Sequence, residues 1–211
     1  MPEICIYLVF EDALHGAVIE KILAASRQKY LVGVRYNAGG FGWIQKRING
    51  FNMAAKGMPY LVLTDLDRHE CAPALIDAWL TGPRNQNLLL RVAVRQVEAW
   101  LLACRSSFAH FAGIEEHLIP ADTDRIENSK RFLLDLVRRS RNAKLRSDIV
   151  PARESTAKVG PDYNGRLMHF VEGSWDPAVA KVHSPSLRKT IDALDRFRFV
   201  RSPSHAQDWD V

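Results

Sequence analysis

Acidic residues follow several apolar runs in the first half of the chain. Glu11 comes directly after the first run, Asp65 and Asp67 follow the third, and Glu98 opens the helical segment after the fourth. Carboxylates brought close together repel one another unless a cation lies between them. Mg²⁺ is commonly held by carboxylates and shares phosphate oxygens with its substrate. These residue types therefore predict a Mg²⁺ or Mn²⁺ site, provided that the fold gathers them.

Strand-like and helix-like segments alternate between these residues, an order that would bring the acidic side chains together. Runs rich in branched and aromatic residues predict strands at 4–10, 30–36, 59–64 and 88–94. Helices are expected over 13–26 with Asp12 as N-cap, from the glycine-rich turn 37–42 to Lys56, over 73–80 and over 97–112. Strands that alternate with helices pair in parallel, and ligands bind beyond their carboxyl ends. We predict an α/β fold with a mostly parallel four-stranded sheet flanked by helices.

Strand signals fade beyond residue 113. A basic helix is expected near 125–140, a loop-rich stretch over 145–165, and a last helix that Ser184 caps ahead of Pro185. The predicted organisation is an α/β core over 1–112, a mainly helical basic extension packed on it over 113–200, and a frayed tail over 201–211.

The net charge of +5 is concentrated in that extension. Residues 125–158 hold ten basic and four acidic residues, so the rest of the chain is about neutral. This segment is either a solvated helix face or a surface for phosphate backbones, which supply most non-specific nucleic-acid affinity. Its one aromatic residue, Phe132, argues against a stacking platform for single strands. Arg138, Arg139 and Arg141 are the predicted nucleic-acid contacts.

Other classes of protein are disfavoured. The longest apolar run has seven residues and no basic signal segment is visible, so we expect a cytoplasmic protein without membrane contact. The three cysteines form no CxxC, and no HExxH, GxSxG or nucleotide-loop motif occurs. Of the seven histidines, only His69 is expected near the acidic edge.

Several stretches resemble a known family. LVFEDALHGAVIEKIL and YLVLTDLDRHE are similar to the glutamate and DxD motifs of the TOPRIM domain of topoisomerases, primases and the overcoming-lysogenisation-defect nucleases. VAVRQVEAWLLA, AKVGPDYNGRLMHF and VHSPSLRKTIDALDRF look more narrowly like small TOPRIM-like bacterial proteins, which are often encoded beside ATPases and suspected in phage defence.

The resemblance implies a TOPRIM-like fold and a Mg²⁺-dependent nuclease that cleaves phosphodiester bonds. It implies that Glu11 is a general acid/base or metal ligand, that Asp65 and Asp67 bind the metal, and that Glu98 completes the cluster. Lys158 would contact the scissile phosphate. An ABC-type or AAA-type ATPase is the implied protein partner, and a homodimer is left open.

Two alternatives stay open at this point. Asp12 and Arg68 stand where TOPRIM motifs commonly have glycine, which favours a degenerate site in an interaction or sensor subunit. A phospho-receiver domain also gathers acids at strand ends, but it needs a lysine after a fifth strand, and no such strand is visible.

Overall fold

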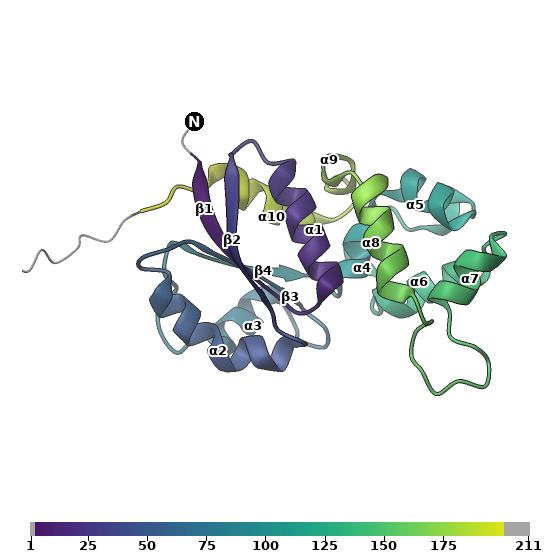
Figure 1. Ribbon diagram of the computed structural model, residues 1–211, viewed down its shortest axis with the longest axis horizontal. Coiled ribbons are helices and arrows are strands. Elements are labelled where there is room, and N and C mark those ends of the chain that lie inside the picture. Colours follow the sequence, from purple (N-terminus) through teal and green to yellow (C-terminus); the bar gives the residue numbers. More distant parts are fainter. Residues whose placement is uncertain (1–2, 201–211) are drawn as a thin grey trace, which may run out of the picture.

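A parallel sheet of four strands organises the computed structural model, which describes residues 3–200 (Figure 1). The strands are β1 (Ile4–Phe10), β2 (Tyr30–Asn37), β3 (Tyr60–Asp65) and β4 (Leu88–Ala93). Their order is β2-β1-β3-β4, and every neighbouring pair is parallel. The predicted α/β fold is confirmed, and its architecture is Rossmann-like. The predicted tail over 201–211 lies outside the described residues.

The sheet is covered on both faces, which explains why its strands read as continuous apolar runs. Side chains alternate between the faces, so that Leu8 and Phe10 of β1 pack in one cluster and Val9 packs in the other. The cluster around Val9 includes α2 (Phe41–Ala54) and α3 (Ala72–Trp79). The opposite face carries α1 (Ala13–Ala24), and Figure 1 shows these layers on either side of the sheet.

The second half of the chain is helical. It contains α4 (Val97–Ala103), α5 (Arg105–Ala112), α6 (Ser129–Arg138), α7 (Ala143–Ile149), α8 (Tyr163–Gly173), α9 (Pro177–Ala180), α10 (Pro185–Arg196) and two 3₁₀ turns, Glu116–Leu118 and Thr123–Arg125. Ser184 caps α10 as predicted, accepting a hydrogen bond from the Leu187 amide at 3.2 Å.

Two predicted segments were wrong in part. The helix expected over 97–112 is broken at Cys104, whose ψ of 62° is not helical, although the apolar stripe continues across the break. The stretch 145–165 was expected to be loop-rich, but α7 occupies its start. Asn142 caps α7 by accepting from the Leu145 amide at 3.0 Å, and Leu145 and Ile149 bury one face of it.

The helical half shares one hydrophobic cluster with the sheet. Trp100 and Trp175 are both fully buried in it, and the Trp175 indole donates to the Trp100 carbonyl at 2.9 Å. The Trp100 indole donates to Ser186 Oγ of α10 at 2.7 Å. Figure 1 shows α8 beside α1, in line with this shared packing. Residues of the extension therefore pack in the same core as the sheet.

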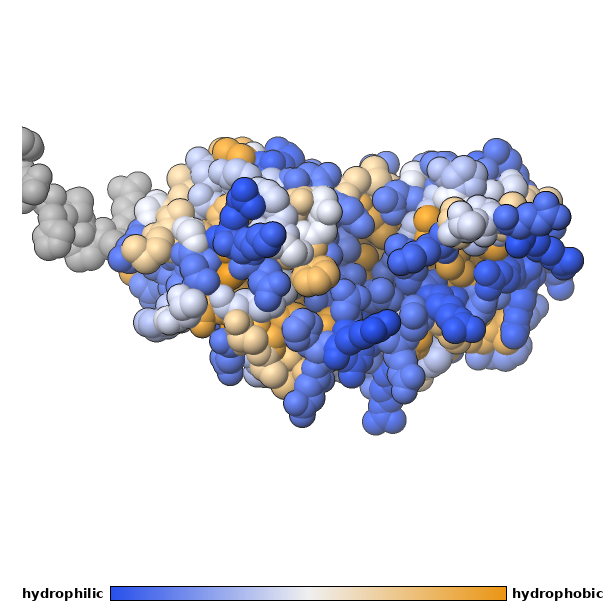
Figure 2. Space-filling model, turned by 90° about the horizontal axis from the view of Figure 1, so that it is seen from below, coloured by the Kyte–Doolittle hydropathy of each residue, from blue (hydrophilic) through white to orange (hydrophobic). Residues whose placement is uncertain are grey.

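Hydrophilic residues dominate the face of the helical half that is in view in Figure 2. Figure 2 shows them over most of that end, with hydrophobic residues only in small patches. Among the helices described, none has the length and apolar character that crossing a bilayer requires.

Candidate metal centre

Glu11 ends β1 and is held by the neighbouring strand. Its Oε1 accepts from Thr64 Oγ1 at 2.6 Å and from the Asp65 amide at 2.8 Å. These two bonds fix a side chain that is only 8% exposed. Because β1 and β3 are parallel neighbours, their carboxyl ends bring Glu11 and Asp65 together as predicted.

His15 lies between two carboxylates in the first turn of α1. Its Nδ1 is 2.8 Å from Asp12 Oδ1, and its Nε2 is 3.0 Å from Asp65 Oδ1. Asp12 is also the N-cap of α1, accepting from the His15 amide at 3.1 Å. The expectation that only His69 lies near the acidic edge was wrong, because His15 is inside the site.

Asp65 joins this cluster to the start of α4. Its Oδ1 accepts from the Val97 amide at 2.9 Å as well as from the His15 ring. The free amides at a helix N-terminus favour a nearby carboxylate. Asp65 is therefore fixed by two elements, α1 and α4, that lie far apart in sequence.

Glu11, His15 and Asp65 together can hold a metal ion. Each offers one ligand atom, and these three atoms lie within 4.8 Å of one another. No group of residues 3–200 donates to Glu11 Oε2 or Asp65 Oδ2. Neither oxygen is a buried atom lacking a partner, so both keep contact with solvent.

Burial and the neighbouring carboxylates shift the pKa values of the residues in the cluster. Burial and the Asp65 charge raise the pKa of Glu11. Burial by itself lowers the pKa of His15, but the Asp65 and Asp12 carboxylates outweigh it and hold that pKa well above its usual value. Burial acts to raise the pKa of Asp12, yet the bond from His15 lowers it to about 2. A protonated His15 thus supplies the positive charge between the carboxylates.

Asp67 lies beyond the strand and outside this group of three. Strand β3 ends at Asp65, Leu66 is buried, and Asp67 adopts left-handed backbone with φ 46°. The alternation that would point Asp65 and Asp67 to the same side applies only inside a strand. Asp67 Oδ1 is 3.4 Å from Gln96 Nε2, and burial together with Asp65 raises its pKa.

Glu98 faces the cluster from the first turn of α4, as predicted, and the extension contributes its partners. The Tyr163 hydroxyl of α8 donates to Glu98 Oε1 at 2.8 Å. Lys130 of α6 places Nζ 3.9 Å from the same oxygen and 4.8 Å from the centre of the Tyr163 ring. Burial and the Asp65 charge raise the pKa of Glu98, and Lys130 opposes this.

The predicted basic contacts lie elsewhere. Arg138 ends α6 and lines one surface hollow, whereas Arg139 and Arg141 line another that also contains Glu115. Lys158 is exposed in the segment between α7 and α8, and no hydrogen bond or ion pair to it exists among residues 3–200. Lys130, which the sequence did not single out, is the extension lysine that approaches the acidic cluster.

A local signal for His15 exists in the sequence. With Asp12 as N-cap, His15 occupies the third helical position, and the residue there faces the capping side chain. The ion pair between Lys130 and Glu98 has no such signal, since it depends on how α6 packs against α4.

Comparisons with family models, with curated proteins and with solved structures each find no match to this chain. The TOPRIM resemblance of the sequence motifs therefore stays a prediction.

Proposed function

We propose that this protein is a nuclease that depends on a divalent metal and hydrolyses phosphodiester bonds in nucleic acid. The observation that carries the proposal is the group Glu11, His15 and Asp65, whose ligand atoms lie within 4.8 Å at the carboxyl edge of a parallel sheet. The TOPRIM-like motifs and the basic extension support the same function. An ATPase partner, a role in phage defence and a homodimer stay predictions.

The donor set fits a divalent metal. A neutral His15 that donates Nδ1–H to Asp12 would turn the Nε2 lone pair toward Asp65, which is the carboxylate–histidine–metal arrangement. Two carboxylates with one imidazole suit Mn²⁺ better than Mg²⁺, which prefers oxygen ligands alone. We therefore expect Mn²⁺ to be the stronger activator.

Other residues of the chain would position the metal ligands, transfer protons and bind phosphate. Asp12 orients His15, while Thr64 and the Asp65 amide hold Glu11. A metal bound here supplies Lewis-acid stabilisation of charge on a phosphate oxygen. Glu98 has a raised pKa that suits proton transfer, and Lys130 beside it adds a positive charge for a phosphate.

The test is nucleic-acid cleavage with matched variants. Supercoiled plasmid and a structured RNA are incubated with the full chain in Mn²⁺, Mg²⁺ or EDTA. Cleavage is expected with Mn²⁺, and Glu11→Gln or Asp65→Asn should lower it by about 10²-fold or more. Asp77→Asn, at an exposed position on α3, is the control and should leave cleavage unchanged. Cleavage that persists in EDTA and in both site variants would contradict the proposal.

One observation favours the second candidate, a non-catalytic interaction or sensor subunit. His15 already bridges Asp12 and Asp65, so its positive charge offsets part of the carboxylate charge without a metal. Calorimetry distinguishes the two: a site that binds neither Mn²⁺ nor Mg²⁺ supports the subunit, and saturable binding supports the nuclease.

A further inference from the structure

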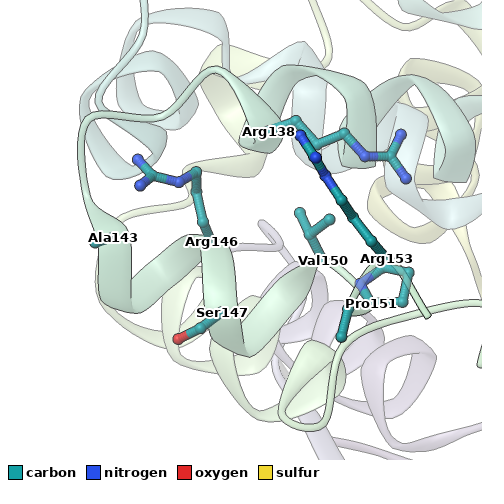
Figure 3. A pocket seen from close by; sticks show the side chains of 8 residues that line it. Arg138, Ala143, Arg146, Ser147, Val150, Pro151 and Arg153 are labelled. Atoms are coloured by element: carbon teal, nitrogen blue, oxygen red, sulfur yellow. The ribbon is translucent and has the colours of Figure 1, made fainter. Parts of the chain in front are cut away.

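A second charged site lies in the extension, separate from the acidic cluster. The end of α6, the helix α7 and the segment 150–153 enclose a surface pocket of about 440 Å³ (Figure 3). Arg138, Arg146 and Arg153 line it, and no carboxylate does. Pockets for small ligands begin at roughly 300 Å³, so the space suits one terminal nucleotide rather than a duplex.

The three arginines differ in how far they are already engaged. Arg138 is bonded to Asp135, and Arg146 donates to the Ser140 carbonyl. Arg153 takes part in no hydrogen bond or ion pair among residues 3–200. Figure 3 shows its side chain reaching from the segment after α7 toward α6, which carries Arg138. Its donors are therefore available to a ligand.

The charge of the pocket matches a phosphate monoester better than a diester. Three guanidinium groups bring three positive charges, and Asp135 offsets one of them. A monoester carries close to two negative charges at neutral pH, whereas a diester in a strand carries one. Arginine also presents paired donors that fit phosphate oxygens.

The rest of the wall suits the nucleoside. Val150 and Pro151 lie among the arginines and give an apolar surface against which a sugar or base can pack. We propose that this pocket binds the terminal phosphate of a nucleic-acid strand. The identity of the ligand as nucleic acid rests on the proposed function, whereas the preference for a terminal phosphate rests on the pocket alone.

Fluorescence anisotropy of labelled oligonucleotides tests the proposal. The full chain is titrated in EDTA with one sequence carrying a 5′-phosphate, a 3′-phosphate or hydroxyl ends, and inorganic phosphate is the competitor. One phosphorylated end is expected to bind about tenfold more tightly than the hydroxyl form. Competition by inorganic phosphate should remove this preference before it removes binding.

Variants separate the pocket from the surface around it. Arg153→Gln and Arg138→Gln should each abolish most of the preference, whereas Arg84→Gln, at an exposed position beside a different hollow, should keep it. Equal affinity for all ends, no binding of any oligonucleotide, or a preference that survives the double variant Arg138→Gln/Arg153→Gln would overturn the proposal. If the parent protein binds phosphorylated ends preferentially but cleaves no nucleic acid in Mn²⁺ or Mg²⁺, only the proposed function is overturned.

Discussion

The His15 side chain joins two carboxylates of the candidate metal centre. It is 4% exposed and bonds to the Asp12 and Asp65 carboxylates, which belong to different elements. Removing it leaves two carboxylates facing each other without a cation. The same side chain therefore stabilises the fold when no metal is bound and offers a ligand when one is.

Replacement of His15 by glutamine should therefore destabilise the metal-free protein. The expected loss is about 1–3 kcal/mol of unfolding free energy, because the Asp12 and Asp65 carboxylates lose their shared charged partner. Urea denaturation in EDTA measures it. His169→Gln, at an exposed position on α8, is the control and should change stability little. Equal stability of the two variants would contradict this role for His15.

Residues that end a strand could be placed correctly from the sequence. The apolar run before Glu11 and the run before Asp65 made both strand ends readable, and the parallel arrangement brought the two residues together. Asp67 could not be placed in the same way, because the chain turns immediately after Asp65. Lys130 could not be found at all, since its partner lies in another helix.

At the scale of elements, the segment between α7 and α8 packs directly against the last residues of α7. The Gly160 amide donates to the Ile149 carbonyl at 2.8 Å, and the Asp162 amide donates to the Asp148 carbonyl at 2.9 Å. A β-carbon on Gly160 would lie 2.4 Å from the Asp148 carbonyl oxygen, which is backbone and cannot rotate away. This contact explains the glycine at that position.

Gly160→Ala should accordingly lower the unfolding free energy by about 1–3 kcal/mol. Gly173→Ala, at the last residue of α8, is the matched control. A β-carbon on Gly173 would enter open space, with no neighbouring atom within 4 Å, so this variant should be neutral or slightly stabilising. Thermal denaturation of both variants measures the difference, and a Gly160→Ala protein as stable as the parent would refute the contact.

Asp148 ties the same two helices together through charge. The buried carboxylate accepts from Lys144 Nζ at 2.9 Å and from Arg166 Nε at 2.8 Å. The hydrogen bond from Lys144, followed by that from Arg166, lowers the pKa of Asp148. A carboxyl whose pKa is lower in the folded state stabilises the fold above its unfolded pKa and loses that contribution as the pH falls.

Asp148→Asn should therefore destabilise the protein most at neutral pH. The difference from the parent should hold down to about pH 4, the unfolded pKa of aspartate, and shrink below it. Melting temperatures across pH 3–7 measure it. Asp77→Asn gives the baseline, and a difference that grows at acid pH would contradict the assigned ion pairs.

The helix ends that sequence patterns missed are not marked by apolar periodicity. Asn142 starts α7 within a stretch of charged residues, where a 3.6-residue pattern is weak. Cys104 interrupts a stripe whose apolar spacing runs on without change. The four strands were readable because burial on both faces made them uniformly apolar.

At the scale of the whole molecule, the two halves of the chain share one hydrophobic core. Trp100 of α4 packs with Trp175 and bonds to Ser186, both from the extension. The Asn87 side chain next to β4 donates to the Val200 carbonyl at 2.8 Å. The acidic cluster depends on the same packing, because Tyr163 and Lys130 reach Glu98 from the extension.

Truncation after residue 112 should consequently abolish cooperative folding. The fragment would expose the apolar faces of α1 and α4, whereas the full chain should unfold in a single transition by circular dichroism and by tryptophan fluorescence. A fragment over 1–112 that unfolds cooperatively, or two separate transitions in the full chain, would show that the core is independent.

Pulsed electron paramagnetic resonance of bound Mn²⁺ shows whether Glu11, His15 and Asp65 form one metal site. A histidine ligand adds ¹⁴N modulation to the Mn²⁺ echo. We expect saturable Mn²⁺ binding with this modulation in the parent protein, loss of the modulation in His15→Gln and loss of binding in Glu11→Gln/Asp65→Asn. Absence of bound Mn²⁺ in the parent, or ¹⁴N modulation that persists in His15→Gln, would contradict the site.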